Sequence, residues 1–154
     1  MYFDISYFDV PENLARLLGF KKIYTIGKQL ELNKSADNII ADDFSLQRFS
    51  ISNVVGVRIN KIDRQFFQKI REEEKVAIID ISNLINASGE GLIKEHKRLK
   101  LMAMNALKAK LNLSIATFAK NEEGLLSSMQ MIEIAKFIGL NEKQAKDAIS
   151  RSLI

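Results

Sequence analysis

The segment Val76-Ala77-Ile78-Ile79-Asp80-Ile81 decides the fold expected for this chain. It has no alternation of polar and apolar residues, so a strand formed by it must be buried on both faces. Such strands are typical of parallel sheets that are covered by helices. A polar loop and a long helix from about Leu92 to Lys110 follow it, and then a second short apolar strand that ends near Thr117. This order of elements predicts an α/β protein.

The remaining elements extend the same alternation of strands and helices. Pro11 favours a first helical turn, Gly19 and Gly139 favour helix ends, Asp63 favours a helix start, and Asn141 begins a capping box. The 154 residues predict one domain, 1–154, with a parallel sheet that is open or barrel-like. The further strands are expected at 2–6, 22–26, 38–41, 47–51 and 54–59, with a turn at 42–43, and the further helices at 13–18, 63–74, 126–138 and from 141.

Composition favours a cytoplasmic protein with a mild positive charge. The formal net charge is +4, which permits binding to nucleic acid without requiring it. The chain has no cysteine, which is consistent with a reducing compartment. No apolar run approaches the ~20 residues of a membrane span, and the first residues lack the form of a signal peptide.

The sequence offers few residues for catalysis or metal binding. Its one histidine, His96, falls on the apolar face of the 92–110 helix, which favours a histidine at the core edge over a metal ligand. Asp80, near a strand end, is interpreted as organising a loop, with a Mg²⁺ site as the alternative. Ser88-Gly89-Glu90-Gly91 matches no phosphate-binding loop and is expected to be a flexible lead-in to the helix, and the chain has no G-x-S-x-G motif. An enzyme that uses only its own side chains is therefore not favoured.

Two basic patches remain as candidate binding surfaces. The first is the outward arc of the 92–110 helix, where Leu101 lies among cations; a solvated face is the alternative interpretation. The second lies at the carboxyl ends of the strands, where α/β folds place their ligands. The first patch contains Lys94, Lys97, Arg98, Asn105 and Lys108, and the second contains Arg58, Asn60, Lys61, Thr117 and Lys120.

Two long stretches carry a family resemblance, KVAIIDISNLI (75–85) and KEHKRLKLMAMNALKAKLNLSIATFAKNEEGLLSSMQMIEIAKFIGLNEKQAKDAISRSL (94–153). Their order resembles the carboxyl half of the archaeal ribonuclease P protein component 3 family, the 30 kDa subunit. Asp80–Ser82 is similar to the family's acid-x-Ser step, Arg98-Leu99 to its Arg-Leu pair, and Ile138-Gly139-Leu140 to a later Leu-Gly step. The resemblance covers roughly 54–153. Ser127-Ser128-Met129 stands where the family has Arg-Ser-Pro, and the chain is short for the family.

The resemblance implies a TIM-like (β/α) barrel, shortened or irregular in the amino-terminal third, that lacks the metal ligands of related phosphoesterases. It implies a non-catalytic subunit that binds ribonuclease P RNA, precursor tRNA and ribonuclease P protein component 2, while the RNA uses Mg²⁺ to remove the 5′ leader. The residues expected to contact RNA or the partner are Lys94, Lys97, Arg98, Lys120, Arg58 and Lys61.

Two other functions remain open at this stage. A barrel-type metal-dependent phosphoesterase would need several His and acidic ligands at one barrel mouth, and the chain has one histidine. A protein-interaction module without an RNA role would bind its partner with no dependence on salt or RNA.

Overall fold

The computed structural model describes residues 1–26, the backbone of 39–42, and residues 54–151. The described strands are all parallel and form two sheets, so the α/β class is confirmed. One sheet pairs β1 (Phe3–Ser6) with β2 (Lys22–Thr25). The other has the order β3 (Ile39–Asp42), β4 (Val54–Arg58), β5 (Val76–Asp80) and β6 (Asn112–Ala116).

Strand β1 lies beside the end of β6, so the first and last strands are neighbours. Ser6 forms an isolated parallel bridge with Ala119, and the Tyr7 amide donates to the Ala119 carbonyl at 2.7 Å. The described strands show no pairing of β2 with β3, and they form no closed barrel. The expected strand at 47–51 and the turn residue Asp43 lie outside the described residues.

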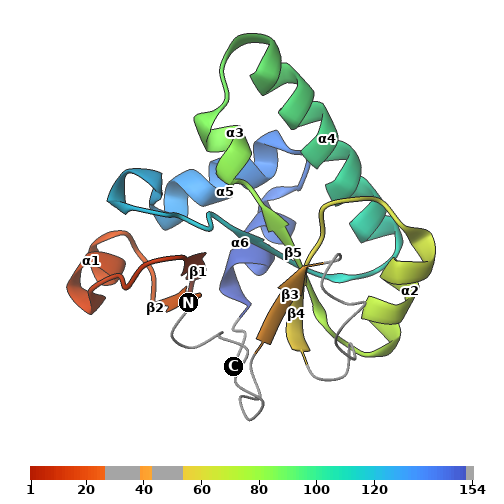
Figure 1. Ribbon diagram of the computed structural model, residues 1–154, viewed down its shortest axis with the longest axis horizontal. Helices are drawn as coiled ribbons and strands as arrows, with labels where there is room; N and C mark the ends of the chain where they lie inside the picture. Colours follow the sequence, from red (N-terminus) through yellow and green to blue (C-terminus); the bar gives the residue numbers. More distant parts are fainter. Residues whose placement is uncertain (27–38, 43–53, 152–154) are drawn as a thin grey trace.

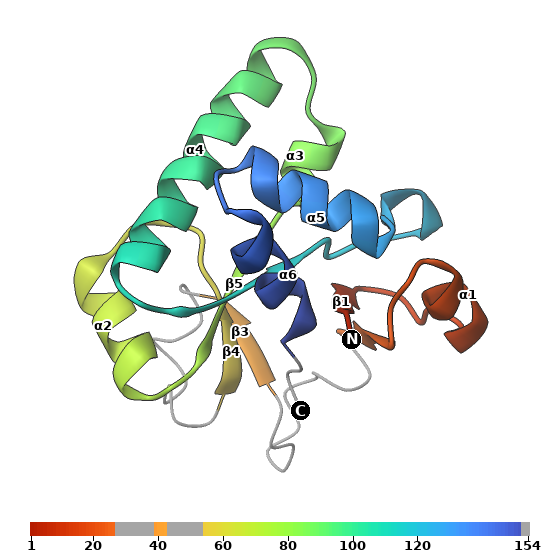
Figure 2. The same cartoon turned by 180° about the vertical axis from the view of Figure 1, so that it is seen from behind.

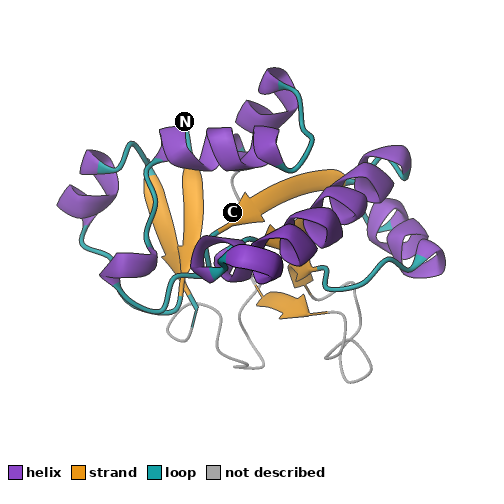
Figure 3. Cartoon of the chain, turned by 90° about the horizontal axis from the view of Figure 1, so that it is seen from above, coloured by secondary structure: helices purple, strands orange, loops and turns teal. Residues whose placement is uncertain are grey.

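Helices cover the outer side of the strands (Figures 1 and 2). Helix α4 packs on β5, and α6 contacts both β6 and β1, so α6 joins the two sheets. Seen from above, the helices spread over both sheets (Figure 3). None of the helices in the described part of the chain is long and apolar enough to cross a bilayer. The helices are α1 (Glu12–Leu17), α2 (Arg64–Glu72), α3 (Ser82–Asn86), α4 (Gly89–Lys108), α5 (Ser128–Phe137) and α6 (Glu142–Ser150), with a 3₁₀ turn at Glu122–Gly124.

The expected burial of β5 on both faces is confirmed. Ala77 and Ile79 join the large core between strands and helices, and both are fully buried. Ile78, also fully buried, joins a second core on the opposite face of the strand. This second core draws residues from both sheets, so the sheets share one apolar interior. Its buried members are Ile5, Tyr24, Ile78, Ala116 and Phe118.

The polar loop expected after β5 is replaced by a short helix, and the flexible lead-in by a helical turn. Asp80 Oδ1 accepts from the Ser82 amide at 2.8 Å, which starts α3 directly after the strand. Gly89 and Gly91, expected in the lead-in, lie in the first turn of α4, which begins at Gly89. Both differences place more of this region in regular structure than its polar sequence indicates.

Four of the described helices end in the same hydrogen-bond pattern, in which the second residue beyond the helix takes a left-handed conformation. Gly19 and Gly139 hold this position after α1 and α5, as the sequence predicts, and Glu74 and Lys110 hold it after α2 and α4. At Lys110 the φ angle is 58°, its amide donates to Leu107, and the Leu111 amide donates to Ala106. A side chain with a Cβ is therefore placed in a conformation that favours glycine.

We expect Lys110→Gly to raise the free energy of unfolding by about 0.5–1 kcal/mol, because it removes the left-handed penalty at a surface helix end. Urea denaturation would measure the change. Lys108→Gly, at the last position inside α4, is the matched control and is expected to destabilise by about 1 kcal/mol. Destabilisation by both variants would contradict this account of the helix end.

Candidate nucleic-acid interface

The carboxyl ends of the strands hold an arginine that several groups fix in place. Arg58, the last residue of β4, donates from Nη1 to Asp80 Oδ2 at 3.3 Å and to the Tyr7 hydroxyl at 2.9 Å. Its guanidinium carbon lies 5.0 Å from the centre of the Phe118 ring. The Arg58 side chain is 24% exposed, so it presents a positioned cation at this edge rather than a fully solvated one.

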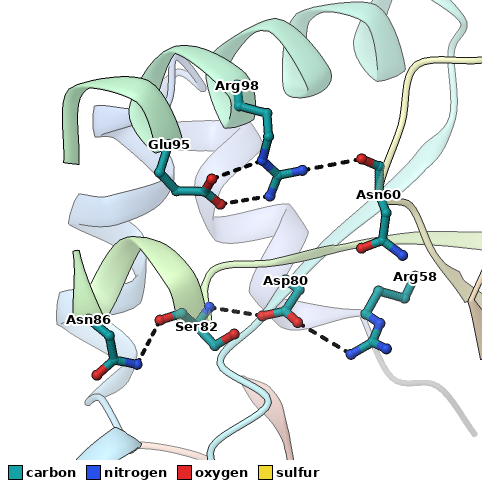
Figure 4. A network of polar contacts seen from close by, with 7 residues as sticks. All are labelled: Arg58, Asn60, Asp80, Ser82, Asn86, Glu95 and Arg98. Atoms are coloured by element: carbon teal, nitrogen blue, oxygen red, sulfur yellow. Dashed lines mark hydrogen bonds and ion pairs between the residues drawn. The ribbon is translucent and has the colours of Figure 1, made fainter. Parts of the chain in front are cut away.

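Asp80 connects this arginine to the start of α3. One carboxylate oxygen faces Arg58 and the other accepts from the Ser82 amide, as Figure 4 shows. Asp80 therefore organises the start of α3, at a place where the sequence predicted a loop. Among the residues that the structure describes, no group of three His, Asp or Glu side chains could hold a metal ion.

Arg98 lies in a different setting from the other basic residues of α4. Its Nε and Nη2 donate to the Glu95 carboxylate at 2.9 and 2.6 Å, and its Nη1 donates to the Asn60 carbonyl at 3.2 Å. The hydrogen bonds to Glu95 raise the pKa of Arg98 above its ordinary value. Arg98 therefore ties α4 to the loop after β4 and brings the two basic patches together at Asn60 (Figure 4).

We expect Arg98→Lys to lower the free energy of unfolding by about 1 kcal/mol, because lysine keeps the charge but cannot form the forked contact that also reaches Asn60. Thermal denaturation would measure it. Lys97→Arg, on the exposed face of the same helix, is the control and is expected to leave the melting temperature unchanged. Equal melting temperatures for the two variants would show that Arg98 does not hold α4 against the loop after β4.

The remaining predicted contact residues are exposed and lie on separate parts of the surface. Lys61 follows Asn60 in the β4–α2 loop, Lys94 and Lys97 lie on α4, and Lys120 follows β6. Lys120 borders a pocket of about 240 Å³ at the ends of β5 and β6, which Asn83, Asn86 and Asn121 also line. Arg58, Asp80 and Lys120 thus belong to the carboxyl edge of the strands, and Lys94 and Lys97 to the outer face of α4.

A buried acid at the same edge is absent from the sequence-based candidates. Asp4 of β1 is 1% exposed; its Oδ1 accepts from the Thr117 and Ile5 amides at 2.8 Å, and its Oδ2 accepts from the Thr117 hydroxyl at 2.6 Å. Burial raises the pKa of Asp4 to about 6, while the hydrogen bonds from Thr117 and Ile5 lower it. The position of this acid between the apolar residues Phe3 and Ile5 of a strand was the signal that could have identified it. The hydrogen bonds from Thr117 to Asp4 therefore connect β1 to the end of β6.

Two aromatic residues of the edge were also missed. Tyr7 is 40% exposed and Phe118 is buried, and their ring centres lie 6.1 Å apart. Phe118 has a φ angle of 46°, an uncommon conformation for an aromatic residue, which is typical of constrained sites. Nothing in the sequence around either residue indicates that they enclose Arg58.

His96 lies at the edge of the core, as expected. Its Nε2 donates to the Phe137 carbonyl at 2.8 Å, and its ring stacks on Phe137 with centres 4.1 Å apart. The histidine joins α4 to α5.

The fold and this edge define a parallel α/β protein that presents polar and cationic side chains beyond the ends of its strands. No protein-family model matches the chain, and no curated protein matches it. A chain in a solved structure, described as a cryo-EM structure of archaeal ribonuclease P with mature tRNA, is similar with a TM-score of 0.66. The two chains are 13% identical, and the match covers 95% of this chain and 76% of that one. At this identity the similarity shows a shared fold.

Proposed function

We propose that this chain is a protein subunit of ribonuclease P that binds RNA and performs no bond cleavage itself. The observation that supports this most strongly is the fold shared, over 95% of the chain, with a chain of archaeal ribonuclease P bound to mature tRNA. The motifs at 75–85 and 94–153 point to the component 3 family of that assembly. The partner in this proposal is ribonuclease P protein component 2.

The proposed RNA contacts are the cations of the carboxyl edge, Arg58, Lys61 and Lys120. Lysine and arginine bind phosphates through charge and carry no sequence information, which suits a subunit that supports a folded RNA. In this proposal the ribonuclease P RNA binds Mg²⁺ and cleaves the 5′ leader from precursor tRNA. The protein lowers the repulsion between phosphates as the substrate approaches.

The finer proposal for the fold is a TIM-like barrel that is shortened or irregular in its amino-terminal third. Its support is the Ser6–Ala119 bridge, which brings the first strand next to the last, and the interior core shared by both sheets. In such a barrel the ends of the strands form one mouth, where Arg58 lies.

Charge reversal at the edge tests the RNA contacts. We expect Lys61→Glu with Lys120→Glu to weaken binding to ribonuclease P RNA about tenfold or more in 100 mM salt, because each reversal replaces a cation that binds phosphate by an anion that repels it. The slope of log affinity against log salt is expected to flatten by about one for each lysine replaced. Filter binding over a salt series would measure both quantities.

Lys143→Glu supplies the control, because Lys143 is an exposed lysine of α6 away from the strand ends. Its affinity and salt slope are expected to change much less. If Lys143→Glu weakens binding as much as the edge variant, binding reflects net charge alone. If neither variant weakens binding, the carboxyl edge is not the RNA surface.

A further inference from the structure

The outer face of α4 exposes large apolar side chains along its length. Ile93 and Leu101 are each 55% exposed and Met104 is 41% exposed, whereas Leu99 and Met102 of the same helix are buried. Ile93, Leu101 and Met104 lie within an arc of about 80° on the helix surface, at 100° per residue. The face therefore forms one stripe rather than scattered residues.

Lysines are interspersed within the same stripe. Lys97 and Lys108 fall inside the arc and Lys94 at its border, and all three are exposed. Glu90 is the acid on this face and lies in the first turn. Glu95 lies off the stripe and pairs with Arg98. The stripe from Lys94 to Lys108 is thus apolar and positively charged.

A pocket extends this face at its carboxyl end. It has a volume of about 320 Å³ and lies between α4 and the start of α2. Ile62, 40% exposed, adds an apolar side chain there. The pocket is lined by Ile62, Arg64, Phe67, Asn105, Lys108 and Ala109.

We propose that this face, defined by Ile93, Lys97, Leu101, Met104 and Lys108, docks an acidic amphipathic helix of a protein partner. The inference rests on the proposed function and specifies the chemistry of its protein partner. A partner helix with an apolar row and flanking carboxylates would bury the three apolar side chains and pair with the lysines. A large side chain of that helix would fill the pocket beside Lys108.

The mixture of apolar side chains and lysines on this face disfavours three other occupants: RNA, a second copy of this chain and a lipid bilayer. An RNA backbone pairs with lysines but leaves Leu101 and Met104 without apolar contact. A second copy of this chain would bring the lysines of two α4 helices together. A bilayer surface favours cations at the flanks of an apolar face, whereas Lys97 and Lys108 lie within it.

The test uses the full chain and a synthetic helical peptide of about 18 residues, with leucine along one face and glutamate on both flanks. Two matched peptides replace glutamate by glutamine, or leucine by serine. We expect the acidic amphipathic peptide to shift the methyl resonances of Ile93, Leu101 and Met104 in NMR spectra. Both replacement peptides are expected to bind at least tenfold more weakly by fluorescence anisotropy.

Substitutions in the chain separate the two parts of the proposal. Leu101→Ser with Met104→Ser is expected to lower peptide affinity at least tenfold, and Lys97→Glu to weaken the glutamate peptide while sparing the glutamine peptide. Met129→Ser, at a 68% exposed methionine of α5, is the matched control and is expected to bind normally.

The inference would be overturned if the acidic peptide did not bind, or if it shifted methyl resonances of residues outside α4. It would also be overturned if ribonuclease P RNA or anionic vesicles shifted the α4 methyl resonances without peptide, or if the chain formed a dimer that Leu101→Ser dissociates. Normal RNA binding without peptide binding would refute this inference alone. Peptide binding to a chain that does not bind RNA would refute the proposed function alone.

Discussion

Thr117→Val is expected to lower the free energy of unfolding by about 2–3 kcal/mol at pH 8. The substitution keeps the shape of the side chain but removes the hydroxyl that donates to Asp4 Oδ2 at 2.6 Å. A buried carboxylate that loses a donor carries the cost of an unmet hydrogen bond next to a charge. Thr117→Ser keeps the hydroxyl and is the matched control, with an expected loss below about 1 kcal/mol.

The pH dependence of stability reports the burial of the same Asp4 carboxyl group, which raises its pKa although the hydrogen bonds from Thr117 lower it. The pKa of folded Asp4 is about 6, against 3.8 as its ordinary value, so the folded state binds this proton more tightly than the unfolded state. The contribution of protonated Asp4 to the free energy of unfolding is therefore fully present below about pH 4 and is lost as the pH rises through 6. A difference of about two units at ~1.4 kcal/mol per unit gives about 3 kcal/mol.

Asp4→Asn is expected to abolish this dependence, because the amide does not titrate and its oxygen still accepts from the backbone. Denaturation in urea at pH 4, 5, 6 and 8 would compare the two proteins. Identical pH profiles for Asp4→Asn and the parent would contradict the assignment of this titration to Asp4.

Ile78→Ala is expected to destabilise the protein by about 2–4 kcal/mol and to loosen β1 and β2 selectively. Ile78 is fully buried in the core that both sheets share, so a cavity there weakens the packing that holds the first sheet to the second. Hydrogen exchange of the Phe3–Ser6 and Lys22–Thr25 amides is expected to rise more than the overall loss of stability explains.

Ile79→Ala is the matched control on the next residue of the same strand. Ile79 is equally buried but faces the core between strands and helices, so we expect a similar loss of stability. We expect Ile79→Ala to raise hydrogen exchange with no preference for the amides of β1 and β2. The same exchange pattern in both variants would mean that the two sheets do not depend on a shared interior.

The elements that the sequence predicted well are those fixed by local chemistry. Val76–Asp80 has an uninterrupted apolar pattern, Asp63 accepts from the Phe66 amide as a helix cap, and Asn141 with Gln144 forms the expected capping box. Glycine marked two helix ends. The ends at Glu74 and Lys110 were not marked, because neither side chain indicates a left-handed conformation.

The site was predicted only in part, because its contacts join distant residues. The strand pattern predicted that Arg58 lies at the end of a strand, where the structure has it, since parallel strands end at one edge. Its contact with RNA stays a prediction. The Asp4–Thr117 contact spans 113 residues, and the Arg98–Asn60 contact spans 38. A helical wheel places Arg98 with the outward lysines but cannot show that Glu95 and Asn60 hold it.

The most direct measurement of the central claim is cleavage of precursor tRNA by ribonuclease P RNA at limiting Mg²⁺, with and without this chain and protein component 2. We expect the proteins to increase the cleavage rate, and digestion of the RNA by nuclease before substrate is added to abolish cleavage entirely. Cleavage by the purified chain that persists after complete nuclease digestion would contradict the claim that the RNA performs the reaction.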